Sequence, residues 1–368
     1  MKFKKRIDRR EKRISKRKGS FSVSPKYTLN SSFKPYNQRN NIFGRLSWDK
    51  SFSAYDVSMY SRIPLILSQN KSGYDRIDFA LALSSWTVYD YFDGAFSWKK
   101  LKDSQSVMAE PKLARFEVKE ENIESVTKRV KSAIKASGAS LVGIAPFDSR
   151  WIYTHDRKSN PIKIPEGITS VITLAIEMDP LGLGTSPALI SNHATGIGYS
   201  KMAFLVSILA EFIRNLGYGA IPCGNDTALS IPIAIDAGLG QLGRNGLLVT
   251  QEFGSRVRLC KVFTDMPLKH DAPIDFGLTD YCRSCRECAK ACEAEAISFD
   301  NNPSFDITSP SNNQGILRWA VDVEKCYEFW IENGGDCSTC ITVCPFNLQA
   351  GGKKDIPPEE FWEKAKEK

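Results

Sequence analysis

The chain has 368 residues, of which 42% are apolar and 25% charged, so it is long enough for two or three domains with a large core. Its formal net charge of +8 suggests at first a nucleic-acid-binding protein. However, residues 1–18 hold eleven Lys and Arg against Asp8 and Glu11, so this arm carries the whole excess and the rest is close to neutral. A nucleic-acid partner is therefore not expected.

Residues 1–35 are expected to be a disordered basic arm followed by a linker rich in Ser, Asn and Pro. The pair Arg9-Arg10 is followed by three charged residues, where a twin-arginine export signal would need an apolar stretch. The longest apolar run, at 203–213, is too short to cross a bilayer. We therefore predict no transmembrane segment and a cytoplasmic location.

An aromatic-rich helical segment is expected over residues 36–119. Within GYDRIDFALALSSW, the positions of Ile77, Ala80 and Leu81 suit an amphipathic helix that buries these residues. The neighbouring aromatic residues are expected to pack on the same side.

Residues 120–270 alternate between helical and strand patterns, which predicts an α/β core with helices packed on a sheet. Apolar residues at helical spacing predict a first helix that ends near Gly138. The stretches ASLVGIA and SVITLAI are typical of strands, and a second helix is expected from Ser200 to about Asn215.

The stretch AGLGQLGRNG contains Gly238, Gly240 and Gly243 in the spacing of the dinucleotide-binding fingerprint. That fingerprint requires a helix after the glycines, whereas Asn245-Gly246 and LLVTQEFG indicate a turn and a strand. Nicotinamide binding is therefore not favoured. We expect these glycines and Asn245 to bring the backbone close to a large cofactor.

Eight of the ten cysteines fall between 282 and 344, and clustered cysteines in a chain that is not exported indicate metal binding. The first four have the spacing C-x2-C-x2-C-x3-C, and the last of the second four is followed by Pro345. In two-cluster ferredoxins the fourth cysteine of such a run binds the other cluster. This rule predicts two 4Fe-4S clusters, one on Cys282, Cys285, Cys288 and Cys344, the other on Cys326, Cys337, Cys340 and Cys292.

Zinc is the alternative, because C-x2-C pairs also form tetrahedral thiolate sites. The triple run and the C-x3-C-P ending favour the clusters. The remaining cysteines, Cys223 and Cys260, are expected to be small buried apolar residues.

Taken with the cysteines, the stretches NQRNNIFGRLSWD, GYSKMAF, GNDTALSIPIAIDAGLGQLGRNG and RVRLCKVFTDMPLKHDAPIDFG resemble the corrinoid-dependent reductive dehalogenases over roughly residues 36–350. The resemblance implies an α+β protein with a nitroreductase-like α/β core at 120–270 that binds cobalamin. A ferredoxin-like domain with two 4Fe-4S clusters would follow at 271–350, then a tail at 351–368. The corrinoid would be base-off, since no D-x-H-x-x-G motif supplies a histidine ligand.

The resemblance also implies three catalytic residues. Tyr199 would donate the proton, Arg258 would stabilise its phenolate, and Asn225 would orient the substrate. Pocket walls are expected from four further residues, Thr195, Leu259, Trp86 and Trp330. The implied partners are a small organohalide substrate and a reduced ferredoxin or flavodoxin as electron donor.

Two other functions remain open from the sequence. One is an epoxyqueuosine reductase, a related enzyme that acts on a modified tRNA base and typically uses an acidic proton donor. The other is an iron–sulfur electron-transfer protein whose cobalamin domain has lost catalysis.

Overall fold

The computed structural model describes residues 22–23, 27–92, 115–349 and 355–366, so the predicted basic arm lies outside the described residues. A four-stranded antiparallel sheet occupies the centre, in the order β2 (Leu141–Pro146), β3 (Ser170–Glu177), β7 (Val257–Thr264) and β4 (Ala220–Cys223). The strands expected in ASLVGIA and SVITLAI are thereby confirmed, and the architecture agrees with the α+β class. The nitroreductase-like description stays a prediction.

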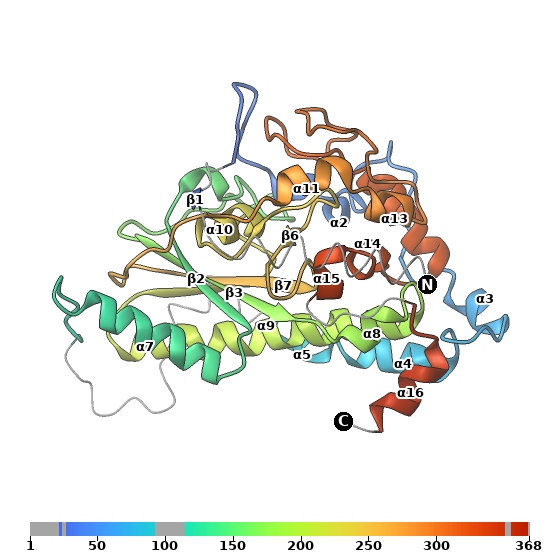
Figure 1. Ribbon diagram of the computed structural model, residues 1–368, viewed down its shortest axis with the longest axis horizontal. Coiled ribbons are helices and arrows are strands. Elements are labelled where there is room, and N and C mark those ends of the chain that lie inside the picture. Colours follow the sequence, from blue (N-terminus) through green and yellow to red (C-terminus); the bar gives the residue numbers. More distant parts are fainter. Residues whose placement is uncertain (1–21, 24–26, 93–114, 350–354, 367–368) are drawn as a thin grey trace.

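Helices cover both faces of this sheet (Figure 1). The helices α7 (Ile123–Ala136) and α9 (Leu189–Asn215) lie on one face, and α10 (Ser230–Asp236) lies on the other. Ile134 and Val206 pack with the sheet residues Ile144 and Leu174, and all four side chains are almost fully buried. Each such burial stabilises the fold by about 1.5–3 kcal/mol.

The helix α9 begins eleven residues earlier than predicted, at Leu189 in place of Ser200. The prediction was wrong because Gly196 and Gly198 are poor helix formers, and tertiary packing overrides that weakness. Within the described part of the chain α9 is also long and apolar enough to cross a bilayer. The core helix of a globular domain can be equally long and apolar, and α9 is largely buried against the sheet.

Over its described residues, the segment before the core contains α2 (Ile42–Arg45), α3 (Ile63–Ser68), α4 (Arg76–Ser84) and α5 (Thr87–Phe92). The sequence had predicted the helix that corresponds to α4. The predicted buried face of α4 was wrong, since Ile77 is 68% exposed while Asp78 and Ala82 are buried. A capping box at Asp75 fixes the start of α4, and contacts with α9 set its orientation.

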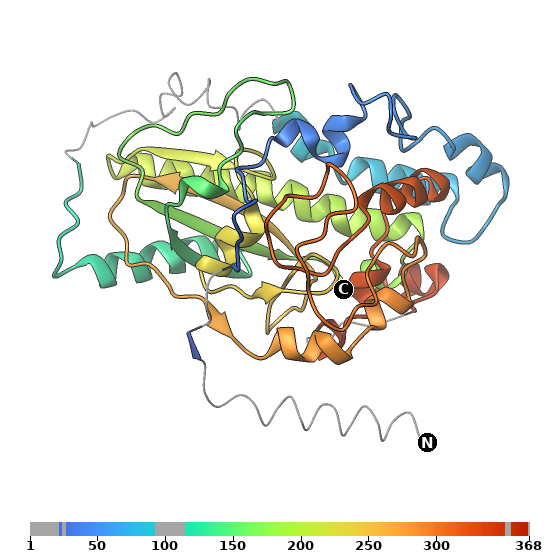
Figure 2. The same ribbon diagram turned by 90° about the horizontal axis from the view of Figure 1, so that it is seen from above.

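The cysteine-rich part contains short helices joined by loops, and it lies on the α10 side of the sheet (Figure 1). Seen from above, the segment that contains α2 to α4 runs beside α13 (Figure 2). The elements of this part are β8 (Ile274–Asp275), α11 (Leu278–Ser284), α12 (Glu287–Lys290), α13 (Val323–Asn333), α14 (Thr339–Thr342) and α15 (Pro345–Gln349).

The predicted C-terminal tail contains a helix, α16 (Pro358–Ala365), that docks on the body. Ile356 and Phe361 are buried there, and the Ile356 backbone N–H donates to the Gly184 carbonyl at 2.9 Å. The remaining elements are β1 (Ser22–Val23), η1 (Gln38–Asn40), η2 (Ser149–Trp151), α8 (Pro180–Gly184), β5 (Gln241–Leu242) and β6 (Leu248–Val249).

Candidate functional site

The structure brings the three predicted catalytic residues together from three elements. Tyr199 lies in α9, Arg258 in β7, and Asn225 in the loop that follows β4. The Asn225 amide Nδ2 donates to the Tyr199 hydroxyl at 2.7 Å, and the Arg258 guanidinium carbon lies 5.1 Å from the centre of the Tyr199 ring. The phenol therefore has a hydrogen-bond donor at its oxygen and a cation at its ring.

Two glycines of α9 make this arrangement possible. A Cβ on Gly196 would lie 2.8 Å from the Trp86 ring, and a Cβ on Gly198 would lie 2.9 Å from the Arg258 Cγ. Contacts under 3.0 Å do not occur between real atoms of this kind. The missing side chains thus let Trp86 and Arg258 approach Tyr199.

Two aromatic rings pack against the half-buried phenol. Trp86 stacks on Tyr199 with the ring centres 4.6 Å apart, and Tyr89 meets it edge to face at 5.0 Å. Such packing fixes the ring plane and keeps water from its faces. Trp86 is therefore in contact with the predicted proton donor.

A buried carboxylate that the sequence reasoning missed lies behind Arg258. The Arg258 Nη2 is 3.4 Å from the Thr195 hydroxyl, and Thr195 also hydrogen-bonds to Asp336. Burial raises the pKa of Asp336, while the Arg258 charge and the Thr195 hydrogen bond act in the opposite direction. The one sequence signal was the placement of an acidic residue directly before the ligand candidate Cys337.

The residues of β7 alternate between two environments. Arg258 lies on the α9 side, whereas Leu259 is on the opposite side, in the apolar cluster that contains Ala175 and Phe263. Leu259 lines neither of the two large cavities of the described structure, so the structure does not bring this predicted pocket wall to the site.

Lys261, which also lies in β7, was another residue that the sequence reasoning missed. Its side chain is fully buried, and its ammonium donates to the backbone carbonyls of Gly224 at 2.9 Å and Asp226 at 3.0 Å, and to the Ser230 hydroxyl at 3.1 Å. These two carbonyls flank Asn225. Lys261 therefore holds the loop that presents the Asn225 amide.

Two cavities meet this group of residues. Arg258 lines a largely apolar cavity of about 430 Å³, together with Trp330, Asn245 and Asp336. Asn225 and Tyr89 line a more polar cavity of about 830 Å³. Arg258 and Asn225 thus each line one cavity, whereas Tyr199, Trp86 and Thr195 line neither of the two.

The eight clustered cysteines divide between two places, as the spacing rule predicts. Cys282, Cys285, Cys288 and Cys344 line one small cavity, while the 430 Å³ cavity is lined by Cys292, Cys326, Cys337 and Cys340. Burial, reinforced by neighbouring thiols, raises the pKa of Cys326 to about 12. Such thiols are protonated without metal, so metal binding must release protons.

Within the described residues, no three His, Cys, Asp or Glu side chains are grouped tightly enough to hold a single metal ion. The other cysteines, Cys223 and Cys260, are buried in the apolar core, as predicted.

The glycine-rich stretch forms the β5–β6 hairpin region and its approach. Cβ atoms on Gly238 and Gly240 would meet the carbonyl oxygens of Ala272 and Val249 at 2.6 and 2.3 Å, so these glycines allow close packing of the chain on itself. A Cβ on Gly243 would meet the Val249 side chain at 2.7 Å. Cofactor contacts by the three glycines remain a prediction, whereas Asn245 lines the 430 Å³ cavity.

Arg244, inside the same stretch, was not singled out by the sequence reasoning. The structure buries its side chain, which is only 1% exposed. Its guanidinium donates to the carbonyl of Cys282 at 2.6 Å and to those of Cys285, Ser298 and Asp300 at 2.7 to 3.0 Å. One buried side chain thus ties together the loops around the first set of cysteines.

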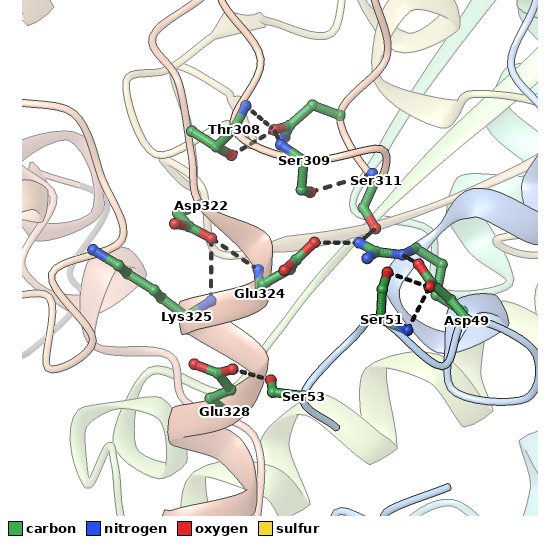
Figure 3. Close-up of polar contacts among 12 residues, drawn as sticks. Asp49, Ser51, Ser53, Thr308, Ser309, Ser311, Asp322, Glu324, Lys325 and Glu328 are labelled. Carbon is green, nitrogen blue, oxygen red and sulfur yellow. Dashed lines mark hydrogen bonds and ion pairs between the residues drawn. The ribbon is translucent and has the colours of Figure 1, made fainter. Parts of the chain in front are cut away.

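The helix α13, which carries Cys326 and Trp330, is fixed by a polar network (Figure 3). Asp322 caps its first turn by accepting from the backbone N–H groups of Glu324 and Lys325. The Glu324 carboxylate accepts from the buried Arg45 of α2, which also pairs with Asp49 at 2.8 Å. The segment before the core therefore orients a cluster ligand and a cavity wall.

The 430 Å³ cavity has features of a site for a large ligand. Its walls include several apolar side chains, among them Leu247, Val321 and Ile341. Three lining residues also have buried donor atoms with no hydrogen-bond partner among the described residues: Asn313 Nδ2, Arg318 Nε and Trp330 Nε1. Each of these donor atoms has under 1 Å² of accessible surface, so none of them faces the cavity. The fit to a large ligand such as a corrinoid therefore rests on the apolar walls.

Comparisons with known proteins agree with this geometry. Residues 281–348 match the 4Fe-4S dicluster domain family. A tetrachloroethene reductive dehalogenase of Desulfitobacterium hafniense is 40% identical over 72% of this chain and 54% of the relative, and one of Sulfurospirillum multivorans is 37% identical over 60% and 50%. The chain thus spans about half the length of these relatives.

An epoxyqueuosine reductase of Leadbetterella byssophila is 29% identical over 64% of this chain and 83% of the relative. In structure, the chain is similar to a catabolic reductive dehalogenase in complex with 3-bromo-4-hydroxybenzoic acid, with a TM-score of 0.66 and 22% identity over 89% of this chain and 44% of that one. At this identity the likeness describes the fold alone.

The fold and the cysteine pattern define an α+β protein that carries a 4Fe-4S dicluster domain. The sequence matches then place it more narrowly. The chain belongs to the reductive dehalogenase family.

Proposed function

We propose that the chain is a reductive dehalogenase that removes halide from a small organohalide with the help of a base-off corrinoid and two 4Fe-4S clusters. The observation that carries the proposal is the contact of Tyr199 with both Asn225 and Arg258, beside a cavity that the second set of cysteines also lines.

Replacing a carbon–halogen bond by carbon–hydrogen consumes two electrons and one proton and releases halide. A corrinoid bound in the 430 Å³ cavity would supply the electron pair to the carbon–halogen bond. Asn245, Trp330, Asn313 and Arg318, which line this cavity, are the residues proposed to hold it. The eight cysteines would hold the clusters that deliver single electrons to this cavity.

Tyr199 is the proposed proton donor. Because Asn225 donates to the phenol oxygen, that oxygen acts as an acceptor and its own hydrogen is left to point toward the substrate. The Arg258 guanidinium, 5.1 Å from the ring centre, stabilises the phenolate that forms when the proton leaves. Trp86 and Tyr89 exclude water from the ring while this occurs.

The proposed electron donor is a reduced ferredoxin or flavodoxin that docks near Cys282, Cys285 and Cys288. Around these cysteines the exposed cations Arg283 and Lys290 pair with Asp280 and Glu287, so this surface offers charges of both signs to a partner. The cytoplasmic location and the absence of a nucleic-acid partner remain predictions from the sequence.

The test is anaerobic reconstitution with iron, sulfide and hydroxocobalamin, followed by metal analysis and a halide-release screen that includes tetrachloroethene. Bound cobalt with halide release supports the proposal. Bound cobalt without release of halide from any compound favours the epoxyqueuosine reductase alternative, to which the match over 83% of that relative draws attention. Bound iron and sulfide without bound cobalt would favour the other alternative, an iron–sulfur electron-transfer protein.

Tyr199→Phe is expected to keep its iron and cobalt but to lose at least ~100-fold in turnover, because a positioned general acid contributes about 10²–10⁴. Tyr60→Phe is the matched control, since Tyr60 packs on Phe79 at the surface. Turnover at the unsubstituted level in Tyr199→Phe would remove this residue as proton donor.

A further inference from the structure

The second set of cysteines includes a sulfur that lies among hydroxyl groups. The Cys337 Sγ is 3.3 Å from the Thr339 hydroxyl oxygen and 3.8 Å from that of Ser186. The Thr339 backbone N–H also approaches this sulfur, at 3.5 Å. Cys292 differs, since its sulfur accepts from a backbone group, the Ala296 N–H, at 3.3 Å. The Cys337 sulfur therefore has side-chain donors that substitutions can remove one at a time.

The two hydroxyl groups come from different parts of the fold. Thr339 begins α14, two residues after Cys337, whereas Ser186 lies in the loop between α8 and α9. The Ser186 hydroxyl oxygen accepts from the Ser338 backbone N–H at 2.8 Å and lies 3.1 Å from the Thr339 hydroxyl oxygen. The α/β core thus reaches into the cysteine-rich part of the chain and positions the Thr339 hydroxyl at the sulfur.

Binding of iron fixes the direction of these hydrogen bonds. The free thiol of Cys337 can donate its hydrogen to Thr339, but a thiolate that binds iron has no hydrogen and can only accept. The Thr339 hydroxyl must then donate to the sulfur, and its oxygen is left as an acceptor for Ser186. The Ser186 oxygen accepts from a backbone N–H and keeps its own hydrogen for that contact. The result is a chain of donors that runs from Ser186 through Thr339 to the Cys337 Sγ.

We propose that Thr339, positioned by Ser186, raises the reduction potential of the cluster on the second set of cysteines. Reduction adds one electron from the external donor, and thus one negative charge, to the cluster and its thiolates. A hydrogen-bond donor at a ligand sulfur therefore stabilises the reduced cluster more than the oxidised one. This role rests on the two clusters of the proposed function. Cys337 and Thr339 line the 430 Å³ cavity, so the electron is favoured on the cluster beside that cavity.

The test is a redox titration of the reconstituted protein with titanium(III) citrate and mediators, followed by electron paramagnetic resonance and without any activity assay. The signal that Cys326→Ala removes identifies the cluster on the second set. Thr339→Val keeps the shape of the side chain and removes its hydroxyl. The equilibrium constant for reduction of this cluster should fall about tenfold, which lowers its midpoint potential by about 59 mV for one electron. The midpoint potential of the other cluster should stay unchanged.

Thr339→Ser restores a hydroxyl and should recover the midpoint potential of the unsubstituted protein. Ser186→Ala should lower the midpoint less than Thr339→Val does, and should have no further effect in the Thr339→Val background. Ser186→Ala also serves if Thr339→Val loses the cluster. Thr342→Val is the matched control and should leave both midpoints unchanged, because the Thr342 hydroxyl in the same helix donates to the Thr339 carbonyl at 3.0 Å. Iron analysis and thermal melting of each variant verify that the clusters and the fold are retained.

Unchanged midpoints in Thr339→Val and Ser186→Ala, or an equal shift of both clusters, would overturn the role of these hydroxyls and leave the proposed function standing. A lower midpoint in Thr339→Val that Thr339→Ser does not restore would overturn it as well, because packing around the cluster would then set the potential. An unsubstituted protein that binds zinc, or that shows no cluster signal after reconstitution, would overturn both this role and the proposed function.

Discussion

At the scale of single residues, two side-chain contacts restrict what the Tyr199 phenol can do. The amide of Asn225 occupies an acceptor position of the phenol oxygen, and Arg258 lies over the ring. Neither contact competes for the phenolic hydrogen, so the phenol can still donate it to another acceptor. The common interpretation of a partly buried tyrosine in a core helix, as a packing residue, does not account for an amide directed at its oxygen.

Gly198→Ala tests how strictly Arg258 must be placed. The new Cβ would lie 2.9 Å from the Arg258 Cγ and should displace the guanidinium from the Tyr199 ring. A cation–π contact contributes about 0.5–2 kcal/mol, so turnover should fall about tenfold. Because alanine favours a helix over glycine by about 1 kcal/mol, the melting temperature should change little.

The control is Gly219→Ala, where the added Cβ would make only an ordinary contact of 3.5 Å with Asp265. Halide release and melting are measured for both variants. Normal turnover in Gly198→Ala would mean that the position of Arg258 over the ring is unimportant.

At the scale of elements, the strand β7 serves the site from both of its faces. Arg258 faces α9 and Tyr199, whereas Lys261 faces the loop that carries Asn225. An offset of three residues reverses the face in a strand, so the two cations act on opposite sides of the sheet. β7 also pairs with both β3 and β4, which makes it a rigid support.

Lys261→Met is expected to destabilise the fold by about 2–5 kcal/mol, because two buried carbonyls and a hydroxyl lose their donor. Turnover should fall with it, since Asn225 is no longer held at the phenol. Lys269→Met, which removes an exposed ion pair with Glu124, is the control and should cost under ~1 kcal/mol.

A double substitution separates positioning from general instability. If Lys261 acts through Asn225, then Asn225→Ala should reduce turnover strongly alone but little further in the Lys261→Met background. Full additivity of the two losses, measured at a temperature where both variants are folded, would contradict this role.

At the scale of the whole molecule, the two sets of cysteines are interleaved along the chain. Cys344 follows the second run in sequence but lines the cavity of the first, and Cys292 does the reverse. Each set of four cysteines is thus completed by a residue from the other half of the domain, so neither half contains a complete set alone.

Substitution of the crossing ligands tests this arrangement. Cys344→Ala and Cys285→Ala should lose the same electron paramagnetic resonance signal, whereas Cys292→Ala should lose the signal that Cys337→Ala loses. Iron content should fall by about half in each case, because a cubane that lacks one of four thiolates is labile. Shared loss between Cys344→Ala and Cys337→Ala would show that the sets are divided differently.

The sequence allowed several of these features to be predicted, and it failed for identifiable reasons. The division of the cysteines was predicted from their spacing along the chain, and the strands β2 and β3 were predicted from their apolar pattern. Both are local properties of the sequence. The start of α9 and the buried face of α4 were wrong, because contacts between these two helices decide both. Lys261, Arg244 and Asp336 were missed, since a charged residue is expected at the surface unless the fold buries it.

By itself, then, the sequence determined the ligand types, their division into two sets and the family, because thiolate spacing and local motifs are properties of the chain. Only the tertiary structure decided that Tyr199, Asn225 and Arg258 meet, and which buried cations hold them. The reason is physical: Tyr199, Asn225 and Arg258 converge only when α9, β4 and β7 pack together.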